Sequence, residues 1–188
     1  MRRISVVETE ENGVVVLTIH FKSPDQLFDR EDPSDLPDKE LTERAEDAIS
    51  GYMDEFPLRR PIRLVIELPT NAFTEKATTL IPEAVRRHFS NRSVDLDHDL
   101  LISRREGMYS ALLMITNIII AVVFVCMEFG NLGTIPGLLL GGLITILNWV
   151  TIWDTYEHFV YDYRYLARKK RIFEKIIRMP IEVREYGV

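Results

Sequence analysis

The sequence has few of the residues on which catalysis and disulfide bonding usually depend. It contains one cysteine, Cys126, among 188 residues, which excludes a disulfide framework and a cysteine-based zinc site. No glycine-rich phosphate loop follows a predicted strand, and no Ser-His-Asp motif or flanked cysteine nucleophile is present. We therefore expect no cofactor and no catalytic residue, and the first hypothesis is a protein that is not an enzyme.

An apolar leader and a basic front half are missing as well. The first residues, MRRISVVETEENG, lack the apolar core of a signal peptide, so we expect no secretory signal. Residues 1–100 hold 21 acidic against 13 basic residues, whereas residues 101–188 hold 8 against 10. The acidic front disfavours nucleic acid as a partner, because such partners need a basic surface.

Charge is also nearly absent from two long neighbouring runs. YSALLMITNIIIAVVFVCMEF (109–129) carries only Glu128, and LGTIPGLLLGGLITILNWVTIW (132–153) carries no charge. A helix of about 20 residues spans about 30 Å, the thickness of a bilayer core. The sequence therefore predicts a two-helix transmembrane hairpin in residues 101–153, rather than a pair of buried helices in a soluble core.

Basic residues lie at only one end of this hairpin. The connection EFGNLGT has no Lys or Arg, whereas Arg104 and Arg105 precede the first span and a basic stretch follows the second. The positive-inside rule then puts both termini in the cytoplasm. We expect a multi-pass protein of the cell inner or plasma membrane.

Small residues recur at steps of four in the second span. They are Gly133, Gly137, Gly141 and Thr145. Such a face lets another backbone approach closely. It packs either against the first span of the same chain or against another chain in an oligomer, and the sequence leaves both open.

Two amides lie in the cytoplasmic halves of the spans. An unpaired amide is costly in lipid, so Asn117 and Asn148 are expected to bond to each other, within or between chains. The alternative is an oligomeric channel lined by these two asparagines and Thr145.

The front of the chain has the pattern of a small α+β domain. Alternating apolar residues predict strands, Asn12-Gly13 predicts a tight turn between the first two, and helical spacing predicts two helices. The second helix begins near Pro82 and is expected to continue toward the first span. The expected order in residues 1–100, a cytoplasmic acidic domain, is β-β-α-β-α: 3–8, 14–22, 39–55, 61–69 and 82–100.

The stretch WDTYEHFVYDYRYLARKK, which follows the second span, places acids and a histidine among aromatic residues. Asp154, His158 and Asp162 recur every four residues, with Glu157 beside them. On a helix this stripe would hold part of a metal shell or move a proton, as in a membrane-bound metal protein or enzyme. Alternatively, its acids pair with arginines one or two turns on.

Residues 154–188 are predicted to form an interfacial aromatic and basic segment with a C-terminal amphipathic helix. Seven basic residues and one acid lie between Arg164 and Arg178. Such clusters attract anionic lipid headgroups, although docking against the acidic domain is the alternative. The expected headgroup contacts are Arg164, Arg168, Lys169, Lys170, Arg171 and Lys175.

Four segments of the chain carry a family resemblance: QLFDREDPSDLPDKELTERAEDAI, PIRLVIELP, EAVRRHF and NWVTIWDTYEHFVYDYRYLARKKRIFEKI. With them the chain resembles an uncharacterised family of small prokaryotic two-span membrane proteins of unknown function. The resemblance covers most of the chain. It implies a topology, and it implies neither an activity nor site residues.

The sequence therefore favours a non-enzymatic integral membrane protein in contact with the lipid bilayer. We expect it to form a homo-oligomer and to act as a scaffold or accessory subunit of a larger membrane complex. The metal protein and the channel described above are the alternatives.

Overall fold

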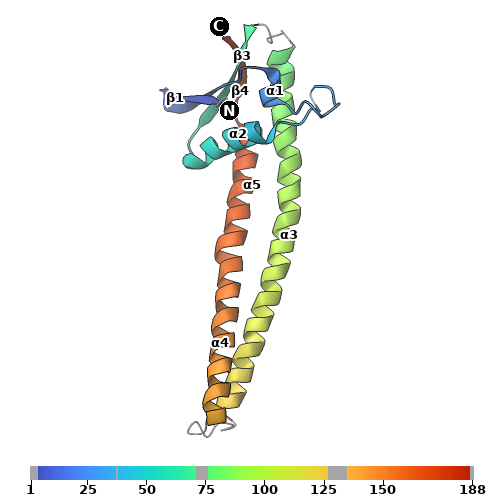
Figure 1. Cartoon of the computed structure of the whole chain (residues 1–188). Helices are drawn as coiled ribbons and strands as arrows, with labels where there is room; N and C mark the ends of the chain where they lie inside the picture. The colour runs from blue at the N-terminus through green and yellow to red at the C-terminus, as the bar shows by residue number, and fades with distance from the viewer. Residues whose placement is uncertain (1–3, 37, 71–75, 127–134, 187–188) are drawn as a thin grey trace. The chain divides into compact units, whose positions relative to one another are not determined.

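The computed structural model describes residues 4–36, 38–70, 76–126 and 135–186 (Figure 1). The described residues form two compact units, one of Met1–Asp95 with Lys169–Val188 and one of Leu96–Arg168. We call them the α+β unit and the hairpin unit. The helices and strands are β1 (Ser5–Glu11), β2 (Val14–His20), α1 (Pro24–Leu27), α2 (Glu43–Glu55), β3 (Ile62–Pro69), α3 (Ala77–Cys126), α4 (Ile135–Glu157), η2 (His158–Asp162), α5 (Tyr163–Arg178) and β4 (Ile181–Tyr186).

The predicted hairpin at the start of the chain is confirmed. β1 and β2 pair antiparallel, with Glu11 opposite Val14, and the two turn residues both have positive φ angles, 52° for Asn12 and 79° for Gly13. Asparagine and glycine tolerate this left-handed backbone better than other residues. The turn therefore fixes which face of β2 carries Val15, Leu17 and Ile19.

The sheet is mixed and has four strands in the order β1-β2-β3-β4. β2 pairs with β3 and β3 with β4 in parallel, and Leu64 lies opposite Ile181. The predicted order β-β-α-β-α is incomplete, because it lacks α1 and the C-terminal strand β4. The predicted segment 154–188 is accordingly divided between the two units, since Lys169–Val188 belongs to the α+β unit.

Parallel neighbours must be joined by a crossover. α2 lies in the connection between β2 and β3, whereas the connection between β3 and β4 holds α3, α4, η2 and α5. The whole hairpin unit is thus inserted into one crossover of the α+β unit. Both flanks of the insertion end in neighbouring strands of the same sheet.

The core of the α+β unit is apolar. Leu17 and Leu64 of the sheet are fully buried, and rings of Phe89 and Phe173 meet at 5.1 Å between centroids. The helices contribute further side chains with at most 4% exposure: Ile49, Met53, Val85, Ile172 and Ile176. The apolar face of α5 therefore belongs to this core, which corrects its predicted position on a membrane surface.

The hairpin unit has the opposite distribution. Its two helices, within Thr78–Cys126 and Ile135–Arg178, are long and apolar enough to cross a membrane. The most apolar stretch is 0% buried in the first and 11% buried in the second. α3 continues unbroken from the α+β unit into the first predicted span, as the sequence indicates, although it begins before Pro82.

The less exposed positions of α3 and α4 recur at alternating steps of three and four. This is the spacing of a coiled-coil seam, in which one stripe of each helix faces the other. The stripe on α3 is Gly107, Ser110, Met114, Asn117, Ala121 and Phe124, and that on α4 is Gly137, Gly141, Ile144, Asn148, Thr151 and Thr155, followed by His158 of η2. The seam is rich in small and polar residues, and the outward positions are apolar.

Candidate functional site

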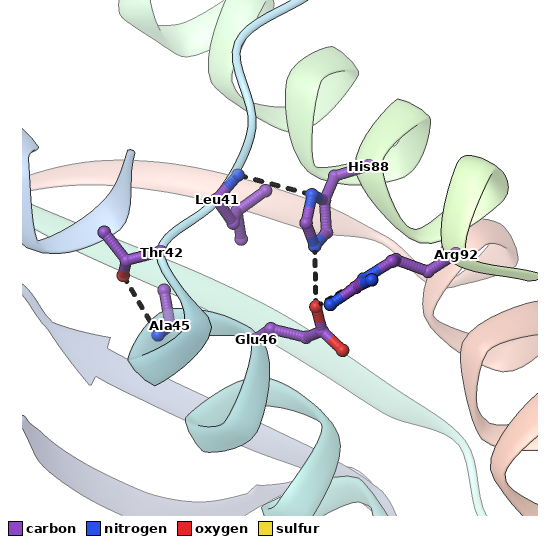
Figure 2. Close-up of polar contacts among 6 residues, drawn as sticks. All are labelled: Leu41, Thr42, Ala45, Glu46, His88 and Arg92. Carbon is purple, nitrogen blue, oxygen red and sulfur yellow. Dashed lines mark hydrogen bonds and ion pairs between the residues drawn. The ribbon is translucent and has the colours of Figure 1, made fainter. Parts of the chain in front are cut away.

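A buried polar cluster joins α2 to α3 in the α+β unit (Figure 2). Glu46 of α2 and His88 of α3 are 6% and 7% exposed. Glu46 Oε2 lies 3.1 Å from His88 Nε2 and 2.9 Å from Arg92 Nε. His88 and Arg92 are four residues apart on one helix, so both reach the same carboxylate oxygen.

The hydrogen bonds assign the tautomer of His88. The Leu41 N–H donates to Nδ1 at 3.3 Å, so Nδ1 carries no proton. Nε2 then carries the proton of the neutral ring and donates it to Glu46. Next to the cluster, Thr42 caps α2 by accepting the Ala45 N–H at 3.2 Å.

The cluster is held by charge. The hydrogen bond from His88, followed by that from Arg92, lowers the pKa of Glu46 from 4.5 to about 2, against the opposing effect of burial. The same carboxylate raises the pKa of Arg92. Because both nitrogens of His88 and the shared oxygen are engaged, the cluster serves to hold α2 against α3.

The sequence interpretation missed this cluster. A signal was present, because Glu46 lies three and seven residues before Ile49 and Met53, within the apolar stripe of α2. An acid in such a stripe needs a buried partner. The partner is 42 residues away, so the sequence does not identify it.

Two residues of the predicted stripe after the second span contact α3. Asp154 accepts a hydrogen bond from Ser110, and His158 Nε2 lies 3.9 Å from Glu106. Residues His158–Asp162 form a π-helical turn, in which Tyr163 N–H bonds to His158 O. Asp162, at the end of this turn, is exposed.

The structure brings only part of the proposed metal set together. Asp154 and His158 each contact a residue of α3, although Asp154 is exposed, as are Glu157 and Asp162. Among the described residues, no group of three His, Cys, Asp or Glu side chains is placed to hold a metal ion. The partners of this region, Ser110 and Glu106, come from the helix of the first predicted span, and the sequence interpretation did not propose them as partners.

The two asparagines bond within one chain, as one of the two predicted arrangements has it. Asn148 Nδ2 donates to Asn117 O at 3.3 Å, and Asn117 Nδ2 donates to Thr151 Oγ1 at 3.4 Å. Thr145 is exposed and donates to Gly141 O on its own helix. The three residues proposed to line a channel therefore do not share one face.

The predicted glycine face lies largely inside the hairpin. Gly137 is buried, and a Cβ atom at Gly141 would lie 3.8 Å from the ring of Phe124. Gly142 faces outward, with nothing within 4 Å of a Cβ atom there. Gly133 lies outside the described residues.

The predicted headgroup contacts are divided between the units. Arg164 and Arg168 are exposed in the hairpin unit, whereas the others belong to the α+β unit. There Lys169 lies over the Phe173 ring, Lys170 pairs with Glu174 at 3.8 Å, and Lys175 donates to Pro57 O at 3.3 Å. Arg171 is exposed in the same unit.

No family model matches the chain, and no curated protein or solved structure is significantly similar to it. Its function is therefore argued from its own geometry. The resemblance to two-span membrane proteins stays a prediction.

Proposed function

We propose that the chain is an integral membrane protein that carries the α+β unit on the cytoplasmic side and acts as a non-enzymatic scaffold or accessory subunit. The observation that carries the proposal is the insertion of the hairpin unit between β3 and β4. Because these strands are neighbours in one sheet, the chain must return to the side from which it left. Two spans satisfy this requirement, and one span does not.

The hairpin's surface supports the same proposal. Asn117, Asn148 and Thr151 bond to one another across the seam, while the outward positions are apolar. Lipid offers no hydrogen bonds, so polar groups of a membrane hairpin must be satisfied internally. Arg104 and Arg105 before the first span, and Arg164 after the second, favour the cytoplasmic side for both flanks.

Self-association is part of the proposal, and it needs a surface outside the seam. Gly137 and Gly141 are used within the hairpin, whereas Gly142 and Thr145 lie on the outward side of α4, three residues apart. A neighbouring helix can approach closely at such small residues. This side of α4 is the contact that we propose between copies.

The test is the mass of the particle extracted in its native lipid without detergent. A simple multiple of the 21.9 kDa chain supports a self-assembling scaffold, and a mass that includes other chains supports an accessory subunit. A single copy alone contradicts both. Gly142→Leu is expected to reduce a multiple to one copy, and Thr116→Leu, an exposed change on α3, is the matched control.

A further inference from the structure

A groove in the α+β unit collects positive charge although the chain is acidic overall. It lies between the segment before β3, the last turns of α5 and the turn into β4, and its volume is about 470 Å³. Five cations line it, with Glu174 as the lining acid: Arg60, Arg63, Arg171, Lys175 and Arg178. The net charge of the chain is −6, so this concentration is not a consequence of composition.

Part of this charge has no carboxylate partner within the described residues. Arg60 pairs with Glu10 at 3.0 Å and Arg63 with Glu182 at 3.3 Å. Arg171 and Arg178 make no hydrogen bond or ion pair with any residue that the structure describes. The positive charge of the groove is therefore incompletely neutralised.

Two further groups in the groove lack the partner that an anion would supply. Arg63 Nε is buried and has no hydrogen-bond partner among the described residues. Lys175 donates to a neutral carbonyl, that of Pro57, and burial lowers its pKa. A buried donor without an acceptor is costly, and an anion would satisfy it.

The helix dipole explains only some of these cations. Lys175 and Arg178 lie in the last turn of α5, where basic residues offset the partial negative charge of the helix end. Arg60 and Arg63 come from a different segment, in front of and within β3. Their convergence with the α5 cations on one groove is not explained by helix capping.

The rest of the groove is aliphatic. Leu58, Pro61, Ile62 and Met179 contribute to its lining, and no Phe, Tyr or Trp does. A groove of this size is in the range of small-molecule sites, which combine an apolar lining with a few polar groups. The absence of a lining ring removes the stacking platform that nucleobases use.

We propose that this groove binds an anionic aliphatic amphiphile, whose phosphate contacts the arginines and whose chain lies on the aliphatic lining. The proposal does not depend on the function proposed above, because it concerns a site within the α+β unit alone. Arginine suits such a headgroup, since its planar guanidinium binds phosphate oxygens in pairs.

The experiment uses the full chain in nanodiscs of phosphatidylcholine and follows amide hydrogen exchange in residues 58–63 and 171–180. The probe is dihexanoyl phosphatidic acid added from solution. Dihexanoyl phosphatidylcholine supplies the same chains without net charge, and inorganic phosphate supplies the anion without chains. A second set of nanodiscs, containing long-chain phosphatidic acid, tests whether the bilayer is the source.

We expect phosphatidic acid to protect both segments from exchange. If the soluble lipid protects them, the ligand comes from solution; if the long-chain lipid in the nanodisc protects them, it comes from the bilayer. Arg171→Gln with Arg178→Gln should weaken binding about a hundredfold, about tenfold for each charge-assisted contact. Arg59→Gln removes an equally exposed arginine outside the lining and should change affinity less than about twofold.

Three results would overturn the proposal. Protection by phosphatidylcholine equal to that by phosphatidic acid would reduce the groove to an apolar surface. Binding of inorganic phosphate as tight as that of phosphatidic acid would show that the acyl chains of the ligand play no part. Protection that survives the double substitution would place the ligand elsewhere.

Discussion

The two units of this chain distribute polar residues in opposite ways. The α+β unit buries phenylalanine, leucine and isoleucine and keeps one charged cluster inside, at Glu46. The hairpin unit exposes most of its aliphatic residues, whereas its less exposed positions include Gly137, Asn117, Asn148 and Thr151. On the proposal that the hairpin crosses a membrane, the difference follows from the two solvents, since water favours apolar burial and lipid favours internal hydrogen bonds.

The buried polar contacts also differ in strength. Glu46 is ionised and receives two bonds of 2.9 and 3.1 Å, whereas the asparagine contacts across the seam are neutral and lie at 3.3 and 3.4 Å. Bonds to a charged group are about twice as strong as neutral ones. The comparison therefore predicts large effects in the α+β unit and small effects in the seam.

The largest effect is expected for Glu46→Ala. It leaves the buried Nε2 donor of His88 without an acceptor and removes the carboxylate partner of Arg92, whose side chain is 49% exposed, which costs about 3 kcal/mol of unfolding free energy. Hydrogen exchange of the β2 and β3 amides in the full chain measures the loss. Glu43→Ala, an exposed acid in the same helical turn, should cost less than about 1 kcal/mol. Equal effects of the two changes would show that the cluster does not hold α2 to α3.

The second-largest effect is expected from acid, which should lower the stability of the α+β unit more than that of the hairpin unit. Folding lowers the pKa of Glu46 from 4.5 to about 2, so its stabilisation is present above pH 4.5 and is lost as the pH falls toward 2. The loss is on the order of 2–3 kcal/mol. The same exchange measurement against pH should show weakening of the sheet while Asn117 and Asn148, which do not titrate, keep the seam. An unchanged acid dependence in Glu46→Gln would contradict this assignment.

A bulky residue in the seam should have a moderate effect. A Cβ atom at Gly107 would lie 3.2 Å from the ring of Phe159, so Gly107→Leu must displace this ring or the helices. Overpacking of this kind costs about 1–3 kcal/mol. Unfolding by SDS titration in mixed micelles measures it. Thr116→Leu, an exposed change on the same helix, is the matched control; a loss as large as that at Gly107 would argue against this seam.

The smallest effect is expected for Asn148→Leu. It removes the bond to Asn117 O across the seam, and such bonds in membrane proteins contribute about 0.6 kcal/mol, with about 1.7 as an upper value. The SDS titration with Thr116→Leu as control resolves it, because the Thr116 hydroxyl, among the residues that the structure describes, bonds only to Leu112 O of its own helix. A loss above 3 kcal/mol would mean that the amide holds more than this hairpin together.

The sequence predicts well those elements that a pattern within one short segment determines. Long uncharged runs indicate the two helices, and Asn12-Gly13 indicates the turn between β1 and β2. β4 was missed because IEVREY is short and mixed, and its partner strand lies more than a hundred residues earlier in the chain. The apolar side chains of α5 lie in the core of the α+β unit, and a sequence pattern does not say whether lipid or a sheet covers such a face.

The candidate sites show the same limit. The sequence identified Asn117 and Asn148, because an amide in an apolar run is conspicuous, and it left open whether they meet within a chain. It did not identify the Glu46 cluster or the basic groove, because the residues of each come from separate segments. The π-helical turn at His158–Asp162 is a feature of the backbone that residue spacing does not reveal.

The central claim is that the hairpin crosses a membrane twice and returns to the sheet from which it left. Single cysteines test it, with Cys126→Ser as background and with Arg59→Cys, Asn131→Cys or Glu185→Cys added one at a time. In sealed vesicles with the outer face exposed, an impermeant maleimide should label position 131 at once and positions 59 and 185 only after lysis. Labelling of positions 59 and 185 from opposite sides, or of all three from one side, would contradict the account.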